Sequence, residues 1–548
     1  MLPENKTGSL SEKAEKISVG IARAGHWVIL AFLLLISVIL CVQSLLYTTV
    51  MRNEEADPSA IYYHDDNILI NIAAIVLLIL CGVFFLRRLL TKINPTIFGT
   101  ALLMYVIIVG FVWNVLTKCT PAHDSYFIVT AAESIAKGDF SQLIYDENAY
   151  NYFYLYPFQL GYTLLCELTY YIFGANTYFA LQIINVLSVA AIYAAILVIV
   201  KLAFSRREVV NLTTLLLFGC LPPILFSTFH YGNLTGFAFS IWAVVFTCLW
   251  IKKRKVVFVP LTAVFIGIGT VLKTNSLIVL VAICLLLLLD LLKNRDVRSL
   301  AAIIMSAALG VSLNSLVITS YEMRADVNFG EGIPKILWLD MGLNESENPD
   351  RPGWYMADRT VGAFYDSGMD PDIAAEKGFE NIKNRIGEFA DNPSYCGKFF
   401  WGKTMSQWND PMYMSIWVCS TRTEAPNDFI QSMYYGSAGI MTENYADIYQ
   451  AIAFVFALSG IVFIIIRKEK RHSIYCAAIP LVILGGFLYH LLFEAMPQYN
   501  LIYFILFVPL AAYGLYALSE TCGGLIKRKK TLRINEGNEI NQTENEEK

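Results

Sequence analysis

The chain has 548 residues, of which 56% are hydrophobic and only 16% are charged, and its mean hydropathy is +0.52. Soluble domains carry about 25% charged residues, so this composition excludes a soluble globular enzyme. The formal net charge of −4 says little about partners, and no nucleic-acid partner is expected. Apolar runs of about 20 residues recur along the chain, the length that crosses a bilayer as a helix. We therefore predict an all-α polytopic membrane protein.

Thirteen apolar runs follow one another along the chain. They lie near 27–48, 68–89, 97–116, 155–173, 177–203, 209–229, 234–251, 256–272, 275–292, 299–319, 448–466, 474–493 and 498–519. If all thirteen crossed, the two chain ends would lie on opposite sides of the membrane. The run 27–48 is too long for a signal peptide and is predicted to be retained as a span.

The basic residues of the short loops test this topology, because such residues favour the cytoplasmic side. Six basic clusters occur, at 87–92, 201–207, 252–255, 293–298, 467–471 and 527–530. All six are cytoplasmic only if one run between 117 and 203 does not cross. The weakest run is 155–173, which contains Pro157, Gln159 and Glu167 and suits a helix lying in the interface. About twelve transmembrane helices remain, with both termini cytoplasmic and the active face extracytoplasmic.

This topology divides the chain into six parts. They are a cytoplasmic tail (1–26), two N-terminal spans (27–96), a transmembrane core (97–319) with a long first outer loop (117–176), an extracytoplasmic domain (320–447), three C-terminal spans (448–519), and a basic, then polar, cytoplasmic tail (520–548). The extracytoplasmic domain is the only part long enough for a soluble unit, and we expect it to be α-rich or mixed.

Polar residues gather where spans end on the outer face. Asp124, in His123-Asp124-Ser125-Tyr126, is a candidate catalytic carboxylate, although it also fits the N-cap of a helix. Lys273 is basic against the topology rule, which suggests an anionic partner such as a phosphate, while snorkelling is the ordinary alternative. His230 has the alternative of a hydrogen-bonded interface histidine. Glu494 is the second candidate catalytic carboxylate.

The outer domain holds five of the nine tryptophans, which would form its core or stack on sugar rings. Trp354, in Pro352-Gly353-Trp354-Tyr355, is the best candidate for sugar binding. The eleven cysteines show no metal-binding spacing; Cys396 and Cys419 are a pair that could form a disulfide.

Several motifs then resemble a known group of enzymes, over roughly residues 97–519. They are His123-Asp124-Ser125-Tyr126, Tyr154-Leu155-Tyr156-Pro157-Phe158-Gln159-Leu160-Gly161-Tyr162, Leu272-Lys273-Thr274-Asn275, and Phe493-Glu494-Ala495 followed by Gln498-Tyr499. The chain resembles the GT-C superfamily of membrane glycosyltransferases, particularly its family 39-like bacterial branch of protein mannosyltransferases and aminoarabinose transferases. The runs Met341-Gly342-Leu343-Asn344 and Gly353-Trp354-Tyr355 resemble the outer domain of such proteins, and the first two spans look like an N-terminal addition.

The resemblance implies a GT-C-like fold, a sugar donor carried on polyprenyl phosphate, and a cell-envelope acceptor at the outer face. It implies a base at Asp124 and substrate contacts elsewhere in the motifs. The candidate substrate-binding residues are His123, Tyr126, Tyr156, Gln159, His230, Lys273, Asn275, Trp354, Gln498 and Tyr499. Related chains often carry arginine where this chain has Gln498, so Lys273 becomes the better candidate for the phosphate contact.

A divalent metal is possible but not indicated, because Asp124, His123, His230 and Glu494 could approach one another but lack local ligand spacing. Two other functions stay open on the sequence alone. The first is a flippase or transporter of lipid-linked sugars, although the spans are nearly free of charge. The second is an inactive GT-C-like binding protein, because Gln498 stands in place of the arginine.

Overall fold

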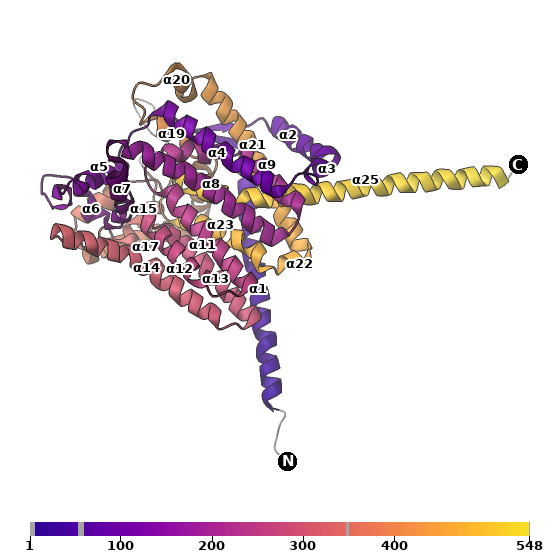
Figure 1. Cartoon of the computed structure of the whole chain (residues 1–548), viewed down its shortest axis with the longest axis horizontal. Helices are drawn as coiled ribbons and strands as arrows, with labels where there is room; N and C mark the ends of the chain where they lie inside the picture. Colours follow the sequence, from indigo (N-terminus) through magenta and orange to yellow (C-terminus); the bar gives the residue numbers. More distant parts are fainter. Residues whose placement is uncertain (1–5, 53–59, 347–349, 547–548) are drawn as a thin grey trace, which may run out of the picture.

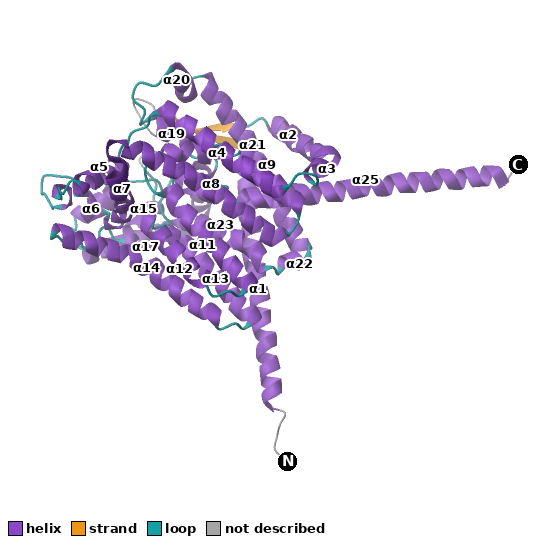
Figure 2. Cartoon of the chain, in the orientation of Figure 1, coloured by secondary structure: helices purple, strands orange, loops and turns teal. Residues whose placement is uncertain are grey.

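A computed structural model describes residues 6–52, 60–346 and 350–546 of the chain. The turn-forming residues Asn348-Pro349 and the middle of the segment 49–67, which joins the first two apolar runs, lie outside these ranges. Figure 2 shows that nearly all of the described chain is helical, with one small pair of strands. The predicted all-α membrane fold is therefore confirmed.

The N-terminal part forms a long helix, a hairpin and a second apolar helix. Its elements are α1 (Lys6–Leu46), β1 (Tyr47–Arg52), β2 (Ala60–Asp65), α2 (Ile68–Cys81), a π-helical turn (Gly82–Leu86) and α3 (Arg87–Leu90). The strands are antiparallel, with Tyr47 opposite Asp65 and Arg52 opposite Ala60. Thr49 donates its backbone N–H to Asn409 O at 3.1 Å, so this hairpin contacts the outer domain.

The transmembrane core consists of long helices joined by short loops. They are α4 (Pro95–Thr117), α8 (Thr177–Phe204), α9 (Arg207–Gly219), α10 (Pro222–Leu225), α11 (Asn233–Lys253), α12 (Phe258–Leu272), α13 (Ser276–Asn294) and α14 (Arg298–Ala325). Helix α11 lies at the centre, packed against α8, α12 and α13.

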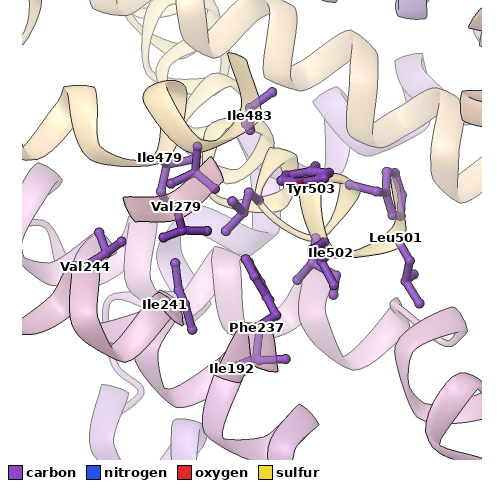
Figure 3. Packing of buried hydrophobic residues seen from close by; sticks show 14 of the residues in the cluster. Ile192, Phe237, Ile241, Val244, Val279, Ile479, Ile483, Leu501, Ile502 and Tyr503 are labelled. Carbon is purple, nitrogen blue, oxygen red and sulfur yellow. The ribbon is translucent and has the colours of Figure 1, made fainter. Parts of the chain in front are cut away.

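The C-terminal helices close the bundle. They are α21 (Ser437–Ile466), α22 (Lys468–Arg471), α23 (Ile474–Leu492), α24 (Pro497–Phe504) and α25 (Phe507–Glu546). Helix α21 packs against α25 and α1, and α23 packs against α13. Apolar side chains from α8, α11, α13, α23 and α24 meet in the core that Figure 3 shows, including Ile192, Phe237, Val279, Ile483 and Ile502. Figure 1 shows the two chain ends, parts of α1 and α25, projecting from the body as single helices.

The described residues contain nine helices long and apolar enough to span a membrane, or eleven if each bent pair counts as one span. The bent pairs are Arg207–Gly219 with Pro222–Thr228, at 50°, and Pro497–Phe504 with Phe507–Ile526, at 44°. These eleven segments correspond to eleven of the twelve predicted spans. The twelfth, 256–272, is the apolar helix α12, which at 15 residues is too short to count by length.

The predicted interfacial run 155–173 contains two short helical turns and α7 (Leu160–Phe173). Helix α7 leads into α8 through a turn at Gly174–Asn176, so that 157–204 is one apolar stretch of 48 residues. This is far more than one crossing needs, since about 20 residues suffice. That 155–173 does not cross by itself stays a prediction.

Two long segments between the spans, the predicted first outer loop and the predicted outer domain, contribute residues in and around the candidate site. The first outer loop contains α5 (Asp124–Ala136), α6 (Tyr152–Leu155) and α7, with α5 packed on α7. The outer domain contains α15 (Lys335–Gly342), α16 (Ala363–Tyr365), α17 (Pro371–Asp391), α18 (Pro393–Trp408), α19 (Ser415–Ser420) and α20 (Asp428–Tyr435). It is built from helices, as the α-rich alternative predicted.

Candidate active site

Asp124 is the first residue of α5, and its carboxylate does not cap that helix. The N-cap residue is His123, which makes no side-chain capping bond and has a φ of 53° and a ψ of −133°. Such a backbone conformation costs a non-glycine residue roughly 1–3 kcal/mol and is common next to functional groups. The N-cap alternative for Asp124 is therefore wrong. Its carboxylate, near the positive end of α5, is free to contact other parts of the site.

Tyr231 connects Asp124 to two further groups. Its hydroxyl donates a hydrogen bond to Asp124 Oδ2 at 2.9 Å and accepts one from Gln159 Nε2 at 2.6 Å. The ammonium of Lys273 lies 3.8 Å from the centroid of the Tyr231 ring. One buried tyrosine thus holds the candidate base at its hydroxyl and the candidate cation on its face.

Lys273 follows α12 in the short loop before α13. Among the described residues its ammonium has no hydrogen-bond acceptor or ion-pair partner, and it contacts the rings of Tyr231 and Tyr499, the latter at 5.7 Å. Burial lowers the pKa of Lys273 to about 7, although the charges of Asp124 and Glu494 oppose this shift. An anion at this place would restore the charge of the ammonium.

Glu494 lies between α23 and α24, where it receives a long hydrogen bond from Tyr499, with 3.4 Å between the hydroxyl and Oε2. Burial raises the pKa of Glu494 to about 7, and the negative charge of Asp124 adds to this shift. Asp124 keeps an exposed surface, but protein groups crowd its carboxylate, and this burial raises its pKa. The two carboxylates and Lys273 therefore influence one another's charge.

A pocket of about 330 Å³ opens beside Lys273. Its lining comes from the starts of α11, α13 and α24, and the residues are Asn233, Phe237, Lys273, Asn275, Ser276, Val279, Gln498, Tyr499 and Ile502. Asn233, Asn275, Ser276 and Gln498 supply polar groups to the lining, and Phe237, Val279 and Ile502 continue into the apolar core (Figure 3). The pocket is thus amphipathic. Because three helices begin at it, their positive ends favour an anion there.

Several predicted substrate-binding residues are not brought to this pocket. The His230 ring is wholly buried, bonds to Tyr178 O at 3.1 Å, and has its pKa lowered to about 4 by burial. The alternative of a hydrogen-bonded histidine is therefore the better interpretation of His230. Trp354 is also enclosed, with its indole N–H donating to Ser406 Oγ at 3.0 Å, so it packs inside the outer domain. Its prediction as a sugar platform is not supported.

The remaining predicted residues lie closer to Asp124 or to the pocket. His123 and Tyr126 flank Asp124 and are exposed. Tyr156 is buried, receives a hydrogen bond from Tyr150 at 3.3 Å and packs near Trp338. Gln159 reaches Asp124 through Tyr231, while Asn275, Gln498 and Tyr499 line the pocket.

Sequence reasoning missed Tyr231, the residue that joins the site. It directly follows His230 in the sequence, and a tyrosine at the end of a span is too common to single out. Tyr355 was also missed: it is 43% exposed, and its pKa is raised mainly by burial and further by the charges of Asp124 and Glu494. Asn233 and Ser276 carried no signal other than their place at the start of an outer-face span.

The eleven cysteines all lie in the described ranges, and all are free. Cys419 does not pair with Cys396; it lies beside Cys119, whose Sγ is 3.8 Å from Cys419 O. Within the described ranges, no three His, Cys, Asp or Glu side chains form a group that could hold a metal ion.

The described residues form a helical bundle with nine to eleven candidate membrane spans, and part of the chain matches a glycosyltransferase family model, which together indicate a membrane glycosyltransferase. Residues 162–329 match the model of glycosyltransferase family 87, a region that includes Tyr231, Lys273 and Asn275. The predicted resemblance to membrane glycosyltransferases is thus confirmed, and the family whose model matches is family 87.

The chain is also similar to the crystal structure of the Archaeoglobus fulgidus oligosaccharyltransferase in complex with zinc and sulfate. The identity is 11%, the TM-score is 0.38, and the match covers 75% of this chain and 48% of that one. The chain thus spans about half the length of that protein. No curated protein sequence matches.

Proposed function

We propose that this glycosyltransferase moves a sugar from a polyprenyl-phosphate donor to a cell-envelope acceptor at the outer face of the membrane. The observation that supports this best is the arrangement around Tyr231, which holds Asp124 at its hydroxyl and Lys273 on its ring face. Tyr231 thus holds a base and an unpaired cation close together. This arrangement suits a reaction in which the base accepts a proton from the acceptor and the cation stabilises the departing phosphate.

The donor phosphate binds in the pocket beside Lys273. The ammonium and the ends of α11, α13 and α24 supply positive charge, and the amides of Asn275 and Gln498 supply donors. The first units of the lipid lie against Phe237, Val279 and Ile502 and continue into the bilayer. This amphipathic lining fits a lipid phosphate better than a water-soluble sugar nucleotide, which would leave the apolar wall uncovered.

Asp124 is the proposed general base. The acceptor hydroxyl loses its proton to the Asp124 carboxylate as its oxygen forms a bond to the anomeric carbon. The bond from that carbon to the phosphate oxygen breaks, and the phosphate keeps the electron pair. Lys273 stabilises the growing phosphate charge, and Glu494, with a pKa raised to about 7, is the second carboxylate of the site.

The outer face is supported by the basic clusters of the short loops. All six clusters fall on one side when 155–173 does not cross, and the ends of the spans that carry Asp124, Lys273 and Glu494 fall on the other. Multi-pass insertion with both termini cytoplasmic follows from the same count. The lipid tail of the donor stays in the surrounding membrane, whose lipids are also expected partners of the protein.

The test is sugar transfer in proteoliposomes that contain the purified protein and radiolabelled polyprenyl-phosphate sugars. Asp124→Asn keeps the shape of the side chain and removes the base, so turnover falls by about 100- to 10,000-fold, the usual contribution of general-base catalysis. Asp372→Asn is the matched control, because Asp372 is an exposed acid in the first turn of α17, as Asp124 is in that of α5. The control keeps the wild-type rate.

Two results would overturn the proposal. Full transfer by Asp124→Asn would show that this carboxylate is not the base. Transfer by the wild type from a sugar nucleotide, with no reaction from any polyprenyl-phosphate sugar, would show that the pocket beside Lys273 binds another donor.

A further inference from the structure

A buried lysine of the outer domain lies behind Glu494. Lys403, on α18, is 0% exposed, and its ammonium donates hydrogen bonds to Gly342 O and to Phe493 O, the latter at 2.7 Å. Burying a lysine is costly, and an apolar residue of the same length would avoid that cost. The two acceptors belong to different parts of the molecule, since Gly342 ends α15 and Phe493 follows α23.

Two glycines allow these backbones to meet. Gly353 has a φ of 73°, and a Cβ there would lie 2.5 Å from Gly342 O and 2.7 Å from Lys403 Nζ. A Cβ on Gly342 would lie 2.3 Å from Leu492 O. Two short segments, Met341–Asn344 and Pro352–Tyr355, therefore form the outer-domain side of a close contact with the Glu494 loop. The proposed reaction does not use these segments directly.

The backbone on either side of Glu494 is held by the same contact. Ala495 donates its N–H to Gly353 O at 2.8 Å, and Phe493 O accepts from Lys403. The Glu494 carbonyl is 3.2 Å from Nδ1 of His490. The two consecutive peptide groups on either side of Glu494 are thus fixed through three backbone atoms, and two of the three partners, Lys403 and Gly353, come from the outer domain.

Lys403 also acts on Glu494 through charge. Burial lowers the pKa of Lys403 to about 7, and the Glu494 carboxylate opposes that shift. In return, the ammonium of Lys403 lowers the pKa of Glu494, against the larger effect of burial.

We infer that Lys403, with Gly342 and Gly353, is a positioning element that holds the Glu494 carboxylate in the active site and couples the outer domain to catalysis. Its effect on turnover rests on the proposed function, but its effect on the Glu494 loop does not. A 1 Å displacement of a catalytic group can lower a rate by about 100-fold, so a clamp on this loop has a measurable consequence.

The first experiment is amide hydrogen exchange on the full-length protein in lipid nanodiscs, which needs no substrate. In Lys403→Met, peptides covering 492–496 exchange about tenfold faster or more, because loss of a charge-assisted bond frees the loop. Lys398→Met is the matched control on the same helix; Lys398 is exposed, and its replacement leaves the loop unchanged. Unchanged protection of 492–496 in Lys403→Met would overturn the inference.

Protection of α18 itself shows whether Lys403→Met is folded. If it is not, Gly353→Ala tests the same contact from the other side, since its methyl group would meet Gly342 O and Lys403 Nζ. Faster exchange confined to 492–496 in Gly353→Ala supports the clamp, and wild-type protection there contradicts it.

The second experiment measures transfer kinetics. Lys403→Met lowers kcat by about tenfold or more, leaves the KM for the donor near the wild-type value, and moves the titration assigned to Glu494 to higher pH, because a nearby cation is lost. A fall in rate without that pH shift would indicate a merely structural role. If the wild type itself transfers no sugar, the proposed function fails while the exchange result still decides whether the clamp exists.

Discussion

Replacing Tyr231 with phenylalanine separates the two contacts that this residue makes. The change removes the hydroxyl that donates to Asp124 at 2.9 Å and accepts from Gln159 at 2.6 Å, but it keeps the ring under Lys273. A hydrogen bond to a charged group contributes about 1.5–3 kcal/mol, which corresponds to a roughly 10- to 150-fold lower kcat if the bond orients the base during the reaction. The KM for the donor should change little, because the cation–π contact remains.

The same substitution should also shift the pH dependence of the reaction in a defined direction. The hydrogen bond from Tyr231 lowers the pKa of Asp124, so its loss raises that pKa further. A base works when deprotonated, and activity is lost as the pH falls through its pKa, so the acid limb of kcat/KM should move to higher pH in Tyr231→Phe. The assay is the initial rate of transfer in proteoliposomes across a pH series, beside Tyr231→Leu, which also removes the ring. A Tyr231→Phe enzyme with wild-type kcat and an unmoved acid limb would refute the role given to Tyr231.

Three further predictions concern charge and packing. Lys273→Met should raise the donor KM by about tenfold or more. The wild-type donor KM should also rise as the pH passes about 7, because the Lys273 ammonium then loses its proton. Donor titrations measure both effects, and Lys335→Met, at an exposed lysine, is the control. Gln498→Arg should lower the donor KM by about tenfold and flatten that rise, because a guanidinium stays charged; an unchanged KM would place the phosphate elsewhere. Trp354→Phe should lower the free energy of unfolding by about 1 kcal/mol through the lost hydrogen bond to Ser406, and thermal unfolding measures this loss. A higher KM for the acceptor with unchanged stability would instead identify Trp354 as a sugar contact.

Much of the fold could be predicted from the sequence because a membrane imposes one length on apolar helices. Eleven of the twelve predicted spans have a counterpart among the candidate spans of the described residues. The exceptions are local. Helix α12 is short, and the run 155–173 continues into α8 through Gly174 without an intervening polar loop, so hydropathy alone does not show where one element ends.

The site was less accessible to sequence reasoning, because it depends on which side chains meet across loops distant in sequence. Lys273 stood out as a cation on the wrong side of the topology rule, a signal that needs no structure. Tyr231 and Lys403 gave no such signal, since neither a tyrosine at a span end nor a lysine in a soluble domain is unusual. Their importance comes from the partners they contact, at Asp124 and at Phe493.

The structure also bears on Gln498, where the resemblance predicted an arginine. A second fixed cation beside Lys273 would repel it and lower its pKa below about 7, unless a phosphate were bound. With Gln498 in that place, the phosphate is bound by Lys273 and by the N-terminal ends of α11, α13 and α24. Together these groups supply enough positive charge and hydrogen-bond donors for one anion. An inactive scaffold has no physical need to keep this ammonium buried beside two carboxylates whose pKa values burial raises, since apolar residues would fill the same space at lower cost. The site thus holds a cation at Lys273 without an arginine at position 498, and transfer kinetics of Gln498→Arg test whether a second cation strengthens donor binding.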